Sequence, residues 1–302
     1  MRMRFALPVV CSVFLSAVLA LSALAQNPET MMPEQSEAKA KQIIQDLINA
    51  RGAAGYLNAT ESECHGTRAQ FGHSGAITGY IPFTESRLYP DKERLEFTAK
   101  SHNLKNIINT VIGVDGLDLA NGGVIVALYN GNQGWTLDRG GITELPATTI
   151  ADFQEQVKRN IDNVLRVRLK EPGWTYRYGG IDTVDLKEVD WVELTDPEQR
   201  TFRLAVDRLT KLLVRSVVIT DNQETREHDE DVNIYSNYQL KGSVWTPMQV
   251  TRLHNDRQVA QFFLDACAYN PGFASDFFDR DSLKKRFGAA KVKKSKQNVD
   301  NN

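Results

Sequence analysis

Residues 231–273 read DVNIYSNYQLKGSVWTPMQVTRLHNDRQVAQFFLDACAYNPGF. Three runs in this stretch are rich in aromatic and β-branched residues, which favour strands, and they cover Asp231 to Leu240, Thr246 to His254 and Gln258 to Tyr269. The turn signal His254-Asn255-Asp256-Arg257 joins the last two runs through so few residues that the strands must be antiparallel neighbours. The stretch therefore predicts part of a meandering antiparallel sheet.

Strand patterns of the same kind occur upstream. Gly123 to Tyr129 is an unbroken apolar run, residues 130–134 form a tight turn, and Trp135 begins the returning strand. Further strand patterns cover residues 60–102 and 174–220, whereas residues 36–51 and 150–165 have apolar residues at helical spacing. Because no internal repeat or linker interrupts them, we predict an α+β fold with one continuous antiparallel sheet and two or three helices.

The N-terminus has the features of an export signal. A basic start precedes an uncharged apolar run from Phe5 to Leu21, and Ala23-Leu24-Ala25 follows. This order is typical of a secretory signal peptide (residues 1–25) cleaved after Ala25, and the run is short for a membrane span. The alternative is an N-terminal membrane anchor that is not cleaved. We expect a periplasmic protein that begins with a mobile leader, residues 26–36.

The charged residues are unevenly distributed. The formal net charge is −2, yet seven basic residues crowd between Lys284 and Lys296, which leaves the rest of the chain acidic. An acidic body argues against nucleic-acid binding, because neutralising phosphates requires a basic face. The composition of residues 284–302 predicts a disordered basic tail. This tail either contacts an anionic membrane surface or is merely a solubilising end.

Two cysteines remain after removal of the signal, Cys64 and Cys267. An exported chain passes through an oxidising compartment, so we predict a disulfide between them; two separately buried thiols are the alternative. We expect no metal site at Cys64, His65 and His73, since adjacent strand residues point to opposite faces and do not readily ligate one ion.

Two other motifs only approach known catalytic or metal-binding patterns. Gly72-His73-Ser74-Gly75-Ala76 lacks the last glycine of a nucleophile elbow, and strand-like residues follow it where the elbow needs a helix. The acidic run Glu227 to Asp231 lacks the spaced ligands of a calcium loop. Both are better explained as turns, and we expect no enzyme: no catalytic residue, cofactor or metal.

Short motifs mark the junctions between the predicted elements. They are Tyr89-Pro90 with Arg94-Leu95-Glu96-Phe97, Tyr129-Asn130-Gly131 with Gly134-Trp135, Leu204 with Asp207, Thr210 and Leu212-Leu213, Tyr235-Ser236-Asn237-Tyr238 with Gly242 and Trp245-Thr246-Pro247, and Asn270 to Phe278. In this order the motifs resemble those of the LolA and LolB family of periplasmic lipoprotein carriers and receptors, and of LolA-like exported proteins of unknown role. The resemblance covers residues 37–283.

The resemblance implies a half-open β-barrel, in which an antiparallel sheet curls around an apolar groove and helices cover the concave side. Val124 to Tyr129 is apolar on both strand faces, so something must cover the second face. Either the strand aromatics line such a groove or they fill a solid core. In the family an arginine holds the lid closed, and Arg94 is the candidate here. The candidate groove residues are Trp135, Tyr176, Tyr178, Trp191, Trp245 and Phe262.

The function that the resemblance implies is the binding or carriage of lipoprotein acyl chains or other lipids. Such a groove gains roughly 0.8 kcal/mol for each methylene it removes from water and needs no catalytic group. The alternative is an envelope interaction or stress-sensor protein, which uses the same fold to grip a membrane-associated protein partner.

Overall fold

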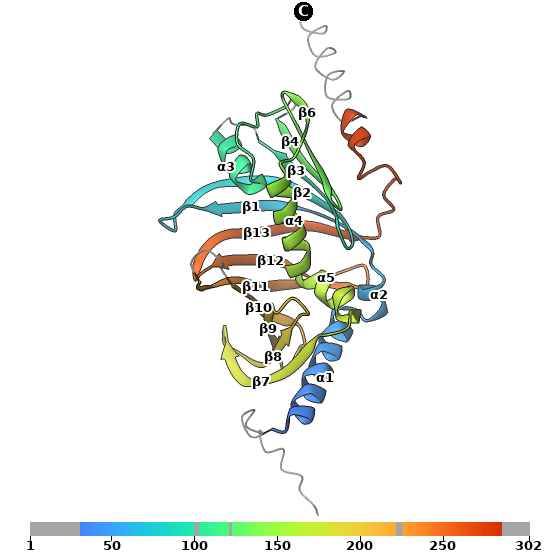
Figure 1. Ribbon diagram of the computed structural model, residues 1–302, viewed down its shortest axis with the longest axis vertical. Coiled ribbons are helices and arrows are strands. Elements are labelled where there is room, and N and C mark those ends of the chain that lie inside the picture. The colour runs from blue at the N-terminus through green and yellow to red at the C-terminus, as the bar shows by residue number, and fades with distance from the viewer. Residues whose placement is uncertain (1–30, 100–102, 121–122, 222–225, 286–302) are drawn as a thin grey trace, which may run out of the picture.

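The computed structural model describes residues 31–99, 103–120, 123–221 and 226–285 (Figure 1). The signal peptide predicted for residues 1–25, most of the predicted leader and the predicted tail from residue 286 onward lie outside these ranges. No helix in the described ranges is long and apolar enough to cross a membrane.

The strands form a single antiparallel sheet with two edges, β6 and β7. Its spatial order is β6-β5-β4-β3-β2-β1-β13-β12-β11-β10-β9-β8-β7, so two meanders, each made of sequence neighbours, meet where β1 pairs with β13. The strands are β1 (Glu61–Phe71), β2 (Ile77–Leu88), β3 (Lys92–Thr98), β4 (Val124–Asn130), β5 (Gln133–Asp138), β6 (Gly141–Glu144), β7 (Thr175–Val184), β8 (Lys187–Thr195), β9 (Thr201–Asp207), β10 (Leu213–Asp221), β11 (His228–Lys241), β12 (Val244–His254) and β13 (Arg257–Tyr269).

The seam between β1 and β13 is joined covalently. Cys64 lies opposite Cys267 in the strand register, and the two form the predicted disulfide. Further along β1 the register shifts between His65 and Gly66, and a Cβ at Gly66 would lie 2.2 Å from the carbonyl oxygen of Phe263. The seam thus brings the first and last strands so close that only glycine fits there.

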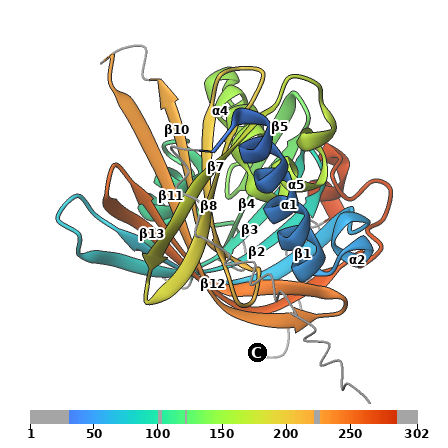
Figure 2. The same cartoon turned by 90° about the horizontal axis from the view of Figure 1, so that it is seen from below.

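The helices cover the concave face of the sheet (Figure 2). Helix α1 packs its apolar stripe against β7 and β8, and α3 packs against β2. Helices α4 and α5 connect β6 to β7, so this connection crosses the concave face from one edge of the sheet to the other. The helices are α1 (Pro33–Arg51), α2 (Ala54–Leu57), α3 (Asn103–Ile112), α4 (Ala147–Arg159), α5 (Ile161–Arg166) and a 3₁₀ turn, η2 (Arg168–Lys170).

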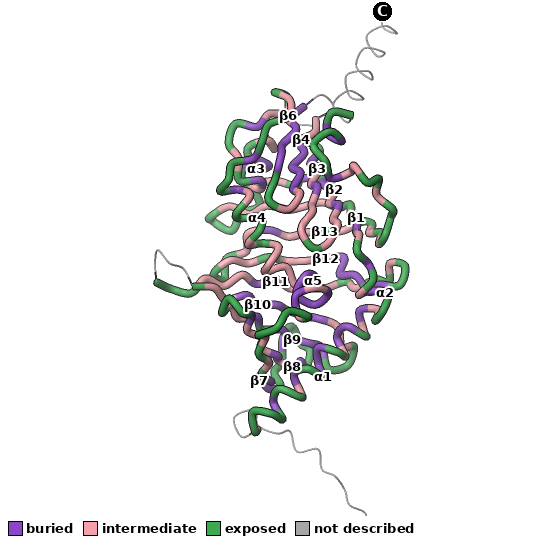
Figure 3. The backbone as a smooth tube through the Cα atoms, turned by 45° about the vertical axis from the view of Figure 1, so that its right-hand side comes forward, coloured by how far each residue is buried: buried purple, intermediate pink, exposed green. Residues whose placement is uncertain are grey.

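The convex face is also covered at β3, β4 and β5. The C-terminal segment, residues 271–285, brings Phe278 and Leu283 against Val126 and Leu128, while Ile125 and its alternate neighbours on β4 face the helices. Both faces of β4 are therefore buried, as Figure 3 shows, which explains its unbroken apolar sequence. The predicted fold, an α+β half-open barrel with helices over the concave side, is confirmed.

Candidate functional site

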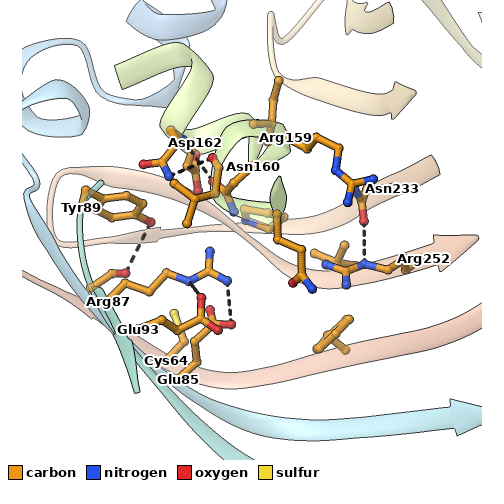
Figure 4. A pocket seen from close by; sticks show the side chains of 18 of the residues that line it. Cys64, Glu85, Arg87, Tyr89, Glu93, Arg159, Asn160, Asp162, Asn233 and Arg252 are labelled. Atoms are coloured by element: carbon orange, nitrogen blue, oxygen red, sulfur yellow. Dashed lines mark hydrogen bonds and ion pairs between the residues drawn. The ribbon is translucent and has the colours of Figure 1, made fainter. Parts of the chain in front are cut away.

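A cavity of about 510 Å³ lies between the concave face of the sheet and a roof made of α4 and α5 (Figure 4). Its size falls in the range of small-molecule sites, roughly 300–1,000 Å³. The floor consists of residues of β1, β2, β3, β10, β11, β12 and β13, so the cavity straddles the seam between the two meanders. We call this cavity the groove.

Apolar side chains form one wall of the groove. Phe83 of β2 meets Phe262 of β13 edge to face, with ring centroids 5.8 Å apart. From the roof, Phe153 faces the sheet and stacks on Tyr129 at 4.2 Å. Leu264 shares the inward face with Phe262, because alternate residues of a strand lie on the same side. This wall can exclude water from an apolar ligand.

The floor of the groove carries a charged strip centred on Arg87. Its Nη2 lies 2.9 Å from Glu85, and its Nε lies 2.9 Å from Glu93, the residue directly opposite in the register of β2 and β3. Burial raises the pKa of Glu93, and the charge of Arg87 opposes that shift. For Arg87, burial lowers the pKa, but the two carboxylates outweigh it and keep the guanidinium charged. Both carboxylates of the strip are thus paired with Arg87 in the absence of a ligand.

A second charged cluster closes the groove at the start of α5. Tyr56 donates a hydrogen bond of 2.6 Å to Asp162, and Arg51 lies 3.3 Å from the same carboxylate oxygen. The guanidinium of Arg166 stacks over the rings of Tyr56 and Tyr89, at 4.2 and 4.7 Å. Burial would raise the pKa of Asp162, but Arg51, Arg166 and Tyr56 outweigh it and lower the pKa to about 2. The Asp162 carboxylate is therefore a fixed negative charge.

A helix cap orders the roof itself, and polar contacts attach it to the sheet on both sides of the groove. Asn160 caps α5 by accepting a 3.0 Å hydrogen bond from the backbone N–H of Asn163. The side chain of Asn163 donates to the carbonyl oxygen of Pro90 at 2.7 Å, and Arg159 pairs with Asp231 of β11 at 3.1 Å. Glu155 of α4 also pairs with Arg200 at 2.7 Å, so the partly exposed Arg159 pair is one of several polar contacts that hold the roof.

Three of the aromatic residues predicted to line the groove lie on the concave side. Phe262 lines the groove itself. Tyr178 is buried beneath α1, donates a 2.9 Å hydrogen bond to Asp190 and lies outside the groove lining. Tyr176 packs at the edge of the same α1 cluster, with the ammonium of Lys41 5.0 Å from its ring centre. Of these three, only Phe262 therefore faces the groove.

The three predicted tryptophans lie elsewhere. Trp135 packs with Phe278 in the convex cluster, and Trp191 packs against the cluster of Val189 and stacks with Arg203 at 5.0 Å. Trp245 is 40% exposed. All three are absent from the groove lining, because each occupies the strand position that alternates with the inward-facing residues.

Arg94, the predicted lid contact, lies on the convex face. It alternates with the inward-facing Leu95 on β3 and donates to the carbonyl oxygen of Phe277 at 3.4 Å and to the hydroxyl of Ser282 at 3.3 Å. Its guanidinium also stacks over Phe277 at 4.7 Å. In this structure Arg94 holds the C-terminal segment, whereas Arg159, Arg51 and Arg200 form ion pairs that hold the roof.

The charged residues of the groove are not among the residues predicted from the sequence. The signal that could have identified them is the alternation of side chains between the two faces of a strand. Glu85 and Arg87 share the face of Phe83 on β2, and Glu93 shares the face of Leu95 on β3, so these charges stand at positions that an apolar core would fill. Charges on the apolar face of a predicted strand thus mark this part of the site.

The motifs examined for catalysis and metal binding have simple structural positions. Ser74 lies in the turn between the antiparallel strands β1 and β2, where a nucleophile elbow would need a following helix. Within the described ranges, no group of three or more His, Cys, Asp and Glu side chains could hold a metal ion.

Comparison with known proteins identifies the fold. No protein-family model and no curated protein matches the chain. A DUF1329 family protein from Desulfovibrio piger aligns over 81% of this chain and 98% of its own, with a TM-score of 0.54 and 12% identity. A LolA superfamily protein from Nitrosomonas europaea aligns over 81% and 99%, with a TM-score of 0.51 and 9% identity. The chain therefore has a LolA-like fold.

Proposed function

We propose that this chain is an exported binding or carrier protein that holds the apolar chain of a lipid or lipoprotein in the roofed groove. The observation that carries the proposal is the cavity of about 510 Å³ with an apolar wall that includes Phe83, Phe153 and Phe262. The LolA-like fold and the export signal expected in residues 1–25 support it.

The energetics of burial suit reversible binding of a single acyl chain. Burying about ten methylenes would gain roughly 8 kcal/mol before the costs of association are subtracted, which leaves a modest net affinity. Arg87 is already paired with Glu85 and Glu93, and Arg51 with Asp162, so an apolar chain can pass these groups without breaking an ion pair. Such a site can load and release its ligand.

A pair of neighbouring residues tests the proposal with a matched control. Phe262 faces the groove, whereas Phe263 points to the convex face and is 37% exposed. The delipidated wild-type protein should take up a fluorescent fatty acid saturably, at about one molecule per chain. Phe262→Asp should abolish this uptake, and Phe263→Asp should leave it intact, because only the first places a charge against the ligand.

Two results would count against the carrier function. A folded wild-type protein without saturable uptake would refute it, and a stable complex with a membrane-associated protein would then favour the interaction or sensor function. Equal uptake by the two variants would show that the fatty acid binds outside the groove. Lipid that copurifies in the absence of detergent, detected by mass spectrometry, would support the proposal independently.

A further inference from the structure

Two arginines flank Phe262 at one end of the groove. Arg68 of β1 and Arg252 of β12 place their guanidinium carbons 5.1 and 5.5 Å from the centre of the Phe262 ring. Because β13 lies between β1 and β12, the two side chains approach the ring from opposite sides. Arg252 is exposed, so this end of the groove opens to solvent. We call it the mouth.

Neither of these arginines has an ion-pair partner among the described residues. The Nε of Arg68 donates to Gln70 at 3.0 Å, and the Nε of Arg252 donates to Asn233 at 3.4 Å; both acceptors are neutral amides. Burial and the like charge of Arg252 lower the pKa of Arg68 to about 9, and the carboxylate of Glu85, which forms no ion pair with it, only partly opposes this shift. Each guanidinium has five N–H donors, so most of this donor capacity remains for a ligand.

The mouth differs from the closed end of the groove in how its arginines are paired. On β12, Thr246 lies at the closed end and Arg252 six residues further on, a separation of about 20 Å. At the closed end Arg51 and Arg166 both act on Asp162, and Arg51 pairs with it directly. At the mouth Asp231 is taken up by Arg159 and His254, so Arg68 and Arg252 pair with no carboxylate in the described part of the chain.

We propose that the groove binds an anionic amphiphile, whose oxyanion headgroup lies at the mouth against the guanidiniums of Arg68 and Arg252 while its apolar chain follows the wall of Phe262 and Leu264. This inference rests on the proposed function and specifies its ligand class. A guanidinium donates paired N–H groups to a phosphate or carboxylate, and an anion at the mouth would reduce the repulsion between the two like charges.

Probes that share one chain and differ in headgroup test the proposal. Dodecyl phosphate, dodecanoate and neutral monododecanoylglycerol are titrated into delipidated full-length protein at low salt by calorimetry, below their micelle concentrations. The wild type should bind at least one of the two anionic probes about tenfold or more tightly than the neutral probe. Arg252→Gln and the double variant Arg68→Gln with Arg252→Gln should reduce this preference to less than about threefold.

Arg203 provides the matched control, because it also stacks on an aromatic ring but lies on the convex face. Arg203→Gln should keep the wild-type preference. Circular dichroism checks that each variant is folded, and Arg252→Gln replaces an exposed side chain, so its result stands even if the double variant unfolds.

The remaining outcomes separate the inference from the proposed function. Equal binding of anionic and neutral probes by the wild type would overturn the headgroup site and leave the carrier function intact. Failure to bind any of the three probes would overturn both. Inorganic phosphate that binds as tightly as dodecyl phosphate would show a site for free anions and would overturn the lipid assignment.

Discussion

Replacing Asp162 with asparagine should destabilise the protein by about 2 to 4 kcal/mol. The pKa of this carboxyl falls from an ordinary 3.8 to about 2 in the folded protein. At about 1.36 kcal/mol for each pKa unit, the shift corresponds to roughly 2.4 kcal/mol of stability at neutral pH. The amide would also leave the buried guanidinium of Arg51 without its carboxylate, and breaking a buried pair costs up to about 3–5 kcal/mol. Asp162 is 25% exposed, which favours the lower part of that range.

The measurement is urea unfolding followed by tryptophan fluorescence, with the disulfide intact, at pH values from 7 down to 2.5. Because the folded pKa of Asp162 is depressed, its contribution is complete above about pH 4 and is lost as the pH falls toward 2. The difference between the wild type and Asp162→Asn should shrink over that interval.

Asp185 supplies the control for this experiment. It is exposed in the turn between β7 and β8 at a φ of 49°, a conformation that asparagine tolerates. Asp185→Asn should change stability by less than about 0.5 kcal/mol at any pH. If Asp162→Asn behaved in the same way at pH 7, or if its effect did not vary down to pH 2.5, the electrostatic reasoning would be refuted.

Three further outcomes are expected. Serine at both Cys64 and Cys267 should lower the free energy of unfolding by about 5 kcal/mol, because the bridge joins residues 203 apart; an unchanged urea midpoint would contradict this. Arg159→Ala should speed fatty-acid release severalfold in stopped-flow assays, since it frees the roof from Asp231, while costing less than about 1 kcal/mol of stability; an unaltered release rate would argue against roof opening. Deleting residues 286–302 should weaken binding to anionic vesicles at low salt only, and equal binding there would exclude a membrane role for the tail.

Much of the sheet could be predicted from the sequence because its contacts are local. The turns between consecutive strands carry clear signals, such as Asn130-Gly131 before Trp135, and antiparallel pairing follows from the short connections. The seam is different. Nothing in the pattern of β1 indicates that its partner is β13, and only the two cysteines pointed to that pairing.

The groove was harder to predict because residue type does not determine which face of a strand is inside. On β4 both faces are apolar, since the C-terminal segment covers the convex side. Trp135 pairs with the outward-facing Leu128 and therefore points outward, although a tryptophan would suit either face. Arg68 and Arg252 are brought together by non-local pairing with β13 and have no shared sequence motif.

The connection between β6 and β7 has a mechanical consequence. Thirteen strands about 4.8 Å apart make a sheet roughly 58 Å wide along its curve, whereas the two helices that cross between its edges, residues 147–166, span about 30 Å. The helices therefore cover only about half of that width, and residues 145–146 and 167–174 complete the crossing. The roof is tied through these segments to both edges of the sheet, so the lengths of the segments limit how far it can lift from the groove. Residues inserted between α4 and α5 would lengthen the roof without altering any strand.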